Sequence, residues 1–297
     1  MDIHISVASK TFLVGEYIAL RGEPCIVVNT QPRFPFHFHQ STTETLNEAS
    51  FAKGSPSHRL LAHYPELHNY RYHAFDPHHK QGGFGASTAE FAALFSLMRP
   101  DLVTPRLTMD QVNQILTIYW DCTRDANNQL PSGADLIGQI NGQITYFART
   151  DTIIKSLSWP FKTLDFYLLR TGHKVPTHEH LKQNIHFPQA KLAHIARTAF
   201  DSLQRVDKVS FINSINQYQE LLVGYELQSQ HTQDLLATLK KTVPIQAAKG
   251  CGALGADVIA VFLFPEHKNL LYQWAKEQEL ALVADHTQLT DGLIKET

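Results

Sequence analysis

The sequence predicts a mixed α+β protein with two domains. The chain has 297 residues, of which 43% are hydrophobic and 18% charged, so it can bury two ordinary cores and is neither disordered nor a coiled coil. Stretches with strand periodicity and stretches with helix periodicity follow one another, and no repeat of solenoid period is present. Trp159-Pro160 indicates a boundary, which divides the chain into residues 1–160 and 161–297.

The first half begins with strands. Ile3, Ile5 and Val7 alternate with other residue types, and residues 25–28 form a short apolar run after the turn at 21–24. Both patterns indicate strands bounded by turn residues. We therefore expect a strand-rich start.

Residues 34–81 are rich in His, Pro and Tyr and have weak periodicity, so only short elements joined by loops are expected there. Eight of the 17 histidines lie in this region. Five of them recur at every fifth position. Five residues turn a helix by about 500°, and in a strand an odd step alternates between the two faces. Histidines at this spacing therefore cannot converge on one metal ion, as metal ligands must. We interpret them as solvated side chains. If the region lines a binding site, their partial protonation predicts weaker anion binding as the pH rises from about 6 to 8. The histidines that recur at every fifth position are His58, His63, His68, His73 and His78.

Two helices are predicted next. The glycine-rich stretch 82–85 breaks any preceding structure, and Ser87 is expected to cap a helix that ends before Pro100. Thr108 opens a second helix, whose apolar residues over 112–119 have helical spacing.

The rest of the chain is again mixed. Residues 131–135 form a further break, and 140–147 indicate a tight turn that leads into a strand. In the second half, apolar runs predict strands and amphipathic patterns predict helices. The expected strands are 166–169, 258–264 and 280–283, and the expected helices are 192–203, 211–225, 235–239 and 267–278.

Charge and composition exclude several classes of protein. The 26 basic and 28 acidic side chains leave a net charge of −2, which argues against non-specific binding of nucleic acid. The N-terminus lacks the basic and apolar pattern of a leader, and no window has the roughly 20 apolar residues of a membrane span. Cys25, Cys122 and Cys251 form no CxxC pair and are interpreted as buried, reduced thiols. We expect a cytoplasmic protein, monomer or homodimer, with a small-molecule substrate.

Two glycine-rich stretches could bind phosphate. In residues 82–89, glycines allow an anion close to the backbone, the next helix directs its N–H groups and positive dipole end at it, and Ser87 could contact magnesium. An ordinary capped helix after a flexible loop is the alternative, and the Walker pattern is absent. Residues 249–255 form the second stretch, whose alternative is a turn into the strand at Val258. Together the two loops would suit a nucleotide polyphosphate between the domains.

Asp135 and Lys10 are candidates for catalysis. Asp135 follows a tight turn and could stabilise a helix dipole, or act as the base that takes a hydroxyl proton during phosphoryl transfer. Lys10 ends the first predicted strand, where a lysine is usually a surface residue, but a cation there could hold such an aspartate ionised.

Four segments, in family order, resemble the motifs of the GHMP kinase superfamily, which includes galactokinase, homoserine kinase, mevalonate kinase and phosphomevalonate kinase. The resemblance implies an N-terminal half like the second domain of ribosomal protein S5, a ferredoxin-like C-terminal half, and ATP and acceptor in the cleft between them. Gly15-Glu16-Tyr17 and Asp257 resemble phosphomevalonate kinases more than mevalonate kinases. The four segments are 10–24, 83–89, 131–135 and 249–257.

The resemblance also implies roles for single residues. Asp135 would be the base, Lys10 would orient it, and Ser87 would contact Mg²⁺. The phosphates of ATP would lie on Gly83, Gly85, Ala86, Ser87 and Thr88, and the acceptor near Glu16, Tyr17, Ser132 and Gly133, with Gly252, Ala253 and Gly255 against the phosphates or the acceptor.

Some positions depart from the family pattern. Ala86 stands where the second motif usually has its first serine, and Arg124 stands where mevalonate kinases have a magnesium-binding glutamate. Asp121 or Asp125 could substitute for that glutamate, or Ser87 could act alone.

The third motif departs from the pattern as well. Leu254 and Ala256 replace glycines, so we expect a stiffer third loop. Arg149, Arg170 and Lys174 are candidates to hold an anionic acceptor.

The hypothesis from the sequence is an ATP- and Mg²⁺-dependent small-molecule kinase with phosphomevalonate as the favoured acceptor. Mevalonate, a sugar or an amino-acid alcohol is the alternative acceptor. A catalytically weak relative that binds a nucleotide or metabolite, or a decarboxylase-type relative, is the alternative of another class.

Overall fold

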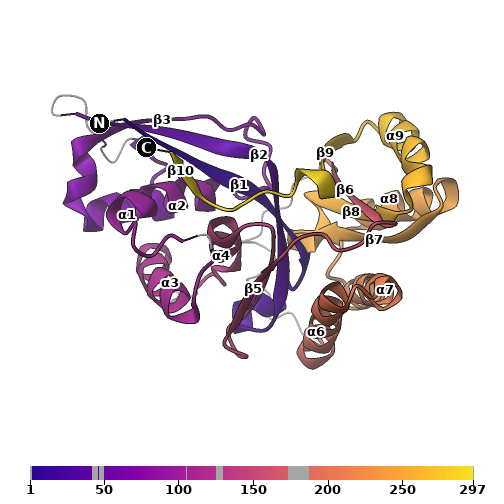
Figure 1. Ribbon diagram of the computed structural model, residues 1–297. Coiled ribbons are helices and arrows are strands. Elements are labelled where there is room, and N and C mark those ends of the chain that lie inside the picture. The colour runs from indigo at the N-terminus through magenta and orange to yellow at the C-terminus, as the bar shows by residue number, and fades with distance from the viewer. Residues whose placement is uncertain are drawn as a thin grey trace.

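The computed structural model describes residues 2–41, 46, 50–104, 106–124, 130–172 and 187–296. Figure 1 shows two lobes, each built on one sheet with helices packed against it. The last strand of the chain lies beside the first strand, so both ends of the chain belong to the first lobe.

The first lobe contains a six-stranded sheet in the order β10-β1-β2-β4-β5, with β3 paired to β2. The strands predicted at 3–7 and 25–28 are confirmed, but both are longer than expected. In β2 the buried Phe34, Phe36 and Phe38 alternate with more exposed residues, a period-2 pattern hidden among histidine and proline. The strands are β1 (Asp2–Val14), β2 (Cys25–Gln40), β3 (Tyr70–Ala74), β4 (Ile144–Ala148), β5 (Ile153–Leu157) and β10 (Ile294–Glu296).

Four helices cover one face of this sheet in two layers. α2 and α4 contact β1 and β2, α1 contacts α2, and α3 contacts α1 and, through Tyr119 and Phe91, α2. α2 is apolar on nearly all sides and is therefore suited to the middle layer. The helices are α1 (Pro56–His63), α2 (Ala86–Met98), α3 (Met109–Thr123) and α4 (Ala134–Asn141).

The first residues of α2 and α3 bear on the two capping predictions, Ser87 and Thr108. Thr108 caps α3 through a capping box with Gln111, as the sequence indicates. The prediction that Ser87 caps α2 is wrong, because the helix begins at Ala86 and its N-cap is Gly85 in the left-handed region. Ser87 therefore keeps its hydroxyl outside the capping interaction.

The second lobe contains a four-stranded antiparallel sheet in the order β7-β8-β6-β9, between helices on both faces. Phe166 and Leu168 of β6 pack in the same core as α7, and Tyr167 and Leu169 pack with α8 and α9. This double burial explains the continuous apolar runs. The elements are β6 (Asp165–Arg170), α6 (Gln189–Arg205), α7 (Lys208–Gly224), α8 (Gln230–Thr242), β7 (Ile245–Cys251), β8 (Val258–Leu263), α9 (Lys268–Glu277) and β9 (Ala281–Asp285).

The C-terminal strand crosses back to the first lobe. β10 pairs with β1, and Arg33 of β2 donates to the carbonyl oxygen of Asp291 at 2.6 Å and to Oγ of Ser6 at 2.9 Å. The chain passes from the first sheet to the second between β5 and β6, around the proposed boundary at 160. A three-residue strand has too little pattern to be found in a sequence, so the return of β10 was missed.

The dense histidines are distributed over several elements. Among the residues described, no three His, Cys, Asp or Glu side chains are arranged to hold a metal ion. The three cysteines are buried free thiols, as predicted. No helix in the described part of the chain is both long and apolar enough to span a membrane. The regularly spaced histidines lie on α1 (His58, His63), a 3₁₀ turn (His68), β3 (His73) and the loop before α2 (His78).

Candidate active site

The glycine-rich loop before α2 depends on backbone conformations that favour glycine. Gly83 has φ +96° and Gly85 has φ +85°. A Cβ atom on Gly83 would lie 2.8 Å from Cβ of Asp257, and one on Gly85 would lie 2.8 Å from Cγ of Lys10. The loop is therefore in close contact with both the first and the third motif.

Phe84 anchors this loop in the core. Its ring is 2% exposed and stacks on the ring of His78 with centroids 4.1 Å apart. Its carbonyl oxygen accepts a hydrogen bond of 3.0 Å from the N–H group of Lys10. The loop is thus attached directly to β1.

A cavity of about 400 Å³ opens beside the loop. The exposed Ser87 lies in the first turn of α2, whose unpaired N–H groups suit an anion. Asp135 lines the same cavity, so a candidate base and a candidate phosphate site meet. The lining consists of residues 82–88 and Asp135, with Phe34, Asp76, His78, Lys80 and Gln81.

Asp135 is held in the first turn of α4. The N-cap, Gly133, has φ +71°, and a Cβ atom there would lie 2.2 Å from Cδ2 of Leu116. Ser132 Oγ accepts a hydrogen bond of 3.2 Å from the N–H of Ala134, which shapes the turn. These contacts fix where the carboxylate enters the cavity.

Lys10 approaches the site without a direct ion pair to Asp135. Its ammonium lies 5.2 Å from the centroid of the Phe12 ring, and its stem lies against Gly85. The ion pairs between described side chains do not include Lys10 or Asp135. The predicted orientation of Asp135 by Lys10 is therefore not made by direct contact in this structure.

Gln139 is a site residue that the sequence reasoning missed. It is fully buried one turn after Asp135 on α4. Its Nε2 donates to the carbonyl oxygens of Ala8 at 2.7 Å and Gly85 at 3.2 Å, and its Oε1 accepts from the hydroxyl of Thr88. This one side chain links β1, the phosphate loop, α2 and α4. The only signal in the sequence is its i+4 spacing from Asp135.

Glu16 and Tyr17 lie at the junction of the lobes. Tyr17 donates its hydroxyl to the carbonyl oxygen of Leu227 at 3.0 Å and accepts from the N–H of Leu254 at 2.9 Å. Glu16 forms an ion pair of 2.5 Å with Lys249. Neither residue lines the 400 Å³ cavity, so their predicted contact with the acceptor stays a prediction.

The third motif joins the phosphate loop through Asp257. A Cβ atom on Gly252 would lie 3.1 Å from Oδ2 of Asp257, the side chain that also contacts Gly83. Gly252 and Gly255 have positive φ, and Ala253 lies between them in a short 3₁₀ turn.

Leu254 takes a left-handed conformation in the same turn, with φ +52°. This conformation costs a residue other than glycine roughly 1–2 kcal/mol. Two hydrogen bonds hold it, since its carbonyl oxygen also accepts from Ser229 N–H at 2.8 Å. The leucine thus occupies a conformation that glycine would adopt freely.

His78 is the histidine of the dense region that lines the cavity. It is 5% exposed, and its Nε2 lies 2.7 Å from Ser9 Oγ. Burial lowers its pKa to about 4, with Asp76 opposing this effect. His78 is therefore neutral between pH 6 and 8, and the predicted change in anion binding over that range is wrong for this residue.

The candidates for the missing magnesium glutamate lie elsewhere. Arg124 follows the last turn of α3, where its carbonyl oxygen accepts from Arg59. Asp121 is exposed on α3 and does not line the cavity. Asp125 is outside the described residues. Ser87, Asp135 and Asp76 line the cavity and carry side-chain oxygens, the ligand type that Mg²⁺ prefers, although both Asp76 oxygens also accept backbone hydrogen bonds.

Of the cations proposed for the acceptor, Arg149 and Arg170 do not line the cavity. The Arg149 guanidinium lies 5.0 Å from the centroid of the Trp120 ring, and Trp120 Nε1 donates to the carbonyl oxygen of Pro131 at 2.9 Å. Arg170 is the last residue of β6, and its positive charge contributes to the lowered pKa of His78. Lys174 is outside the described residues.

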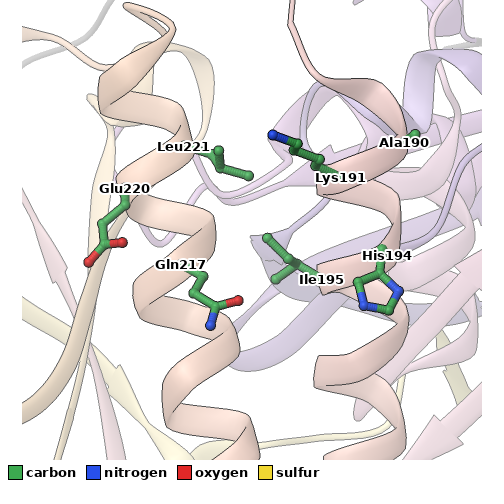
Figure 2. A pocket seen from close by; sticks show the side chains of 7 residues that line it. All are labelled: Ala190, Lys191, His194, Ile195, Gln217, Glu220 and Leu221. Carbon is green, nitrogen blue, oxygen red and sulfur yellow. The ribbon is translucent and has the colours of Figure 1, made fainter.

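A larger cavity of about 580 Å³ lies between α6 and α7, as Figure 2 shows. It contains no residue of the four motifs, and its walls are mainly apolar. The candidate site is therefore the smaller cavity. The larger one is lined by Ala190, Lys191, His194, Ile195, Gln217, Glu220 and Leu221.

Solved structures share this architecture. No family model matches the sequence, and no curated protein matches it. The phosphomevalonate kinase of Streptococcus pneumoniae, in complex with phosphomevalonate and AMPPNP, is similar over 95% of this chain and 98% of its own, with a TM-score of 0.75 and 15% identity. The chain has the fold of the GHMP kinases.

Two further structures have the same GHMP kinase fold. The mevalonate kinase of Methanococcus jannaschii is similar over 97% of this chain and 98% of its own, with a TM-score of 0.71 and 12% identity. The galactokinase of Lactococcus lactis, complexed with galactose, is similar over 99% of this chain and 95% of its own, with a TM-score of 0.73 and 9% identity. The fold predicted from the four motifs is confirmed over nearly the whole chain.

Proposed function

We propose that the chain is an ATP- and Mg²⁺-dependent kinase that phosphorylates a small anionic acceptor, phosphomevalonate being the acceptor we favour. The observation that carries this proposal is the cavity where the glycine-rich loop, the first turn of α2 and Asp135 meet. Phosphoryl transfer depends on positioning and charge neutralisation more than on covalent chemistry. The cavity provides groups for both tasks.

The loop and α2 would hold the phosphates of ATP. The close approach of backbone at Gly83 and Gly85, together with the start of α2, favours a bound polyphosphate. Lys80 lines the cavity and adds a positive charge beside the loop. Since the chain has a net charge of only −2, such local cations must attract the nucleotide.

Mg²⁺ fits the oxygen atoms present in the cavity. In nucleotide sites it is usually held by one or two carboxylates together with the substrate phosphates. Ser87, with Asp135 or Asp76, would supply the protein ligands. The bound ion would neutralise negative charge on the phosphates during transfer.

Asp135 would accept the proton of the acceptor hydroxyl. The acceptor oxygen forms a bond to the γ-phosphorus while the bond to the β,γ-bridging oxygen breaks, and ADP leaves. The proton passes to the carboxylate of Asp135. The positive charge of Lys10, next to Gly85, would stabilise the anionic transition state.

The choice of phosphomevalonate has two supports. The segment Gly15-Glu16-Tyr17 and the aspartate Asp257 resemble phosphomevalonate kinases, and one structural neighbour was solved with that compound. Arg149 and Arg170 would hold its anionic groups. Mevalonate and other small alcohols remain the alternatives, since kinases of mevalonate and galactose share the fold. We expect the enzyme to act in the cytoplasm.

One observation favours a second candidate, a relative that binds the nucleotide with little turnover. Ala86 is exposed at the cavity, in the position where the family motif usually has a serine. Without that hydroxyl the loop would offer one contact fewer to phosphate or metal, as in a relative that has lost part of its catalytic machinery.

The test is ADP release with mevalonate, phosphomevalonate, homoserine and galactose, each with ATP and Mg²⁺. We expect turnover with phosphomevalonate and its loss in Asp135→Asn. Faster turnover with another acceptor would change the substrate assignment. Nucleotide binding without turnover on any acceptor would favour the binding protein and contradict the kinase.

A further inference from the structure

A buried ion pair joins the two lobes beside the candidate site. Lys249 Nζ lies 2.5 Å from Glu16 Oε1, and the two side chains are 0% and 6% exposed. Glu16 Oε2 is buried and has no hydrogen-bond partner among the described residues. Lys249 therefore makes the side-chain contact that orients this carboxylate.

The pair connects two segments that carry site residues. Glu16 follows Lys10 by six residues, just beyond the end of β1, and Lys249 lies in β7, three residues before Gly252. Lys249 Nζ also donates to the carbonyl oxygen of Gly250 at 2.6 Å. One ammonium group thus binds both the first motif, at Glu16, and the start of the third motif, at Gly250.

Neighbouring contacts hold the same junction. The N–H of Gly15 donates to the hydroxyl of Tyr218 at 2.9 Å, and Lys249 Nζ lies 5.5 Å from the centroid of the Tyr218 ring. The N–H of Leu254 donates to the hydroxyl of Tyr17 at 2.9 Å. Backbone amides of both motifs therefore depend on side chains of the opposite lobe.

Electrostatic contacts link the junction to the candidate catalytic residues. Burial raises the pKa of the Cys25 thiol, and the charges of Asp135 and Glu16 raise it further. Burial raises the pKa of the Cys251 thiol to about 11, and Lys10 is among the cations that oppose this. The charges of Glu16 and Asp135 thus act on one buried thiol, and those of Lys249, Glu16 and Lys10 on the other.

We propose that Lys249 is a positioning residue: through Glu16 it fixes β1 and Lys10 relative to the glycine-rich loop of the third motif, residues 249–255, and so sets the geometry of phosphoryl transfer. The role in transfer rests on the proposed kinase function. An error of about 1 Å in the position of reacting groups can cost about 100-fold in rate. The ion pair is suited to prevent such an error because it is short, buried and placed between the two motifs.

The test compares Lys249→Met, the double variant Glu16→Gln/Lys249→Met, and Arg197→Met. Arg197 on α6 pairs with Asp151 at 2.8 Å and with Glu23 at 3.1 Å, so it also joins the two lobes, but at a more exposed position, and it serves as the control. We expect Lys249→Met to lower kcat about 100-fold, with the acceptor KM changed less than about threefold. The double variant should recover thermal stability without recovering kcat, and the control should keep its kcat.

Recovery of kcat together with stability in the double variant would overturn the proposal, because the pair would then act on stability alone. Hydrogen exchange at Gly15 and Leu254 gives a readout independent of turnover. We expect at least about tenfold faster exchange at both amides in Lys249→Met and no change in Arg197→Met. If the wild type turns over no acceptor, the kinase proposal fails and exchange decides the positioning role: unchanged rates at both amides would overturn it.

Discussion

The residues of the first motif lie in two very different environments. Lys10 lies beside the open cavity, against the glycine-rich loop and without an ion-pair partner among the described side chains. Glu16 and Tyr17 are almost fully buried and bonded to the second lobe. A few residues of sequence thus separate a group free to meet a ligand from groups that join the lobes.

This contrast shows that residues of one motif need not share one task. At the cavity, Ser87 is exposed and makes no side-chain bond to the helix cap, as a residue that must bind phosphate or metal requires. The junction is dense with hydrogen bonds and includes a charged pair that burial makes costly. Variants of the two regions should therefore differ in kind, with cavity variants changing turnover and junction variants changing stability as well.

The largest expected effect is that of Asp135→Asn on turnover. Removing a general base typically costs about 10²–10⁴-fold in kcat. Asp135 accepts one hydrogen bond, from the N–H of Leu136, and asparagine can accept the same bond, so the melting temperature should change little. Steady-state kinetics measures the loss of kcat and calorimetry the melting temperature. A large loss of stability would contradict the difference proposed between cavity and junction variants.

Lys249→Met should have the largest effect on stability, roughly 3–5 kcal/mol, because it leaves the buried Glu16 without its partner. Burial already raises the pKa of Glu16, although Lys249 opposes this, and the substitution would raise it further. The folded variant then binds a proton that the unfolded chain has lost above about pH 4.5, so the destabilisation grows with pH. Denaturant unfolding at pH 5 and pH 8 measures it, and an equal loss at both would contradict the account.

His78 should make the protein sensitive to acid. Its pKa of about 4, against about 6.5 in an unfolded chain, means that the unfolded state binds more protons between these values. Stability should thus be full above about pH 6.5 and fall by roughly 3 kcal/mol as the pH falls to 4. In His78→Gln this part of the slope should vanish. An unchanged slope between pH 4 and 6.5 would assign the acid sensitivity to other groups.

Gln139→Leu should have a smaller effect, on both stability and nucleotide binding. The substitution removes the donor to the carbonyl oxygen of Ala8, while Thr88 and Gly85 keep the hydrogen bond between them, and we expect a cost of about 1–3 kcal/mol. The loosened phosphate loop should raise the KM for ATP. Gln273→Leu, at an exposed position on α9, is the matched control and should change neither quantity.

The sequence predicted most strands and helices that have clear periodicity. The residues that it proposed for the phosphates, 83–88, and the proposed base, Asp135, line one cavity, and their roles stay predictions. It missed β10 and the length of β2, because a three-residue strand has no period and histidine and proline hid the alternating phenylalanines.

The burial of single polar side chains, and their partners far along the chain, could not be predicted from the sequence. Nothing local shows that Lys249 would be fully buried 233 positions from its partner Glu16, or that Gln139 would hold the phosphate loop. The predicted N-cap of α2 was also wrong, because the helix is capped by Gly85 in the left-handed region and not by Ser87. Such features depend on the packing of distant segments.

Transfer of the γ-phosphoryl group of labelled ATP to phosphomevalonate, followed in a single turnover, tests the central claim most directly. We predict a labelled acceptor in the presence of Mg²⁺ with the wild-type protein, and a transfer rate lower by at least about 100-fold in Asp135→Asn. Equal transfer rates in the two proteins would contradict the assignment of Asp135 and of the cavity beside it.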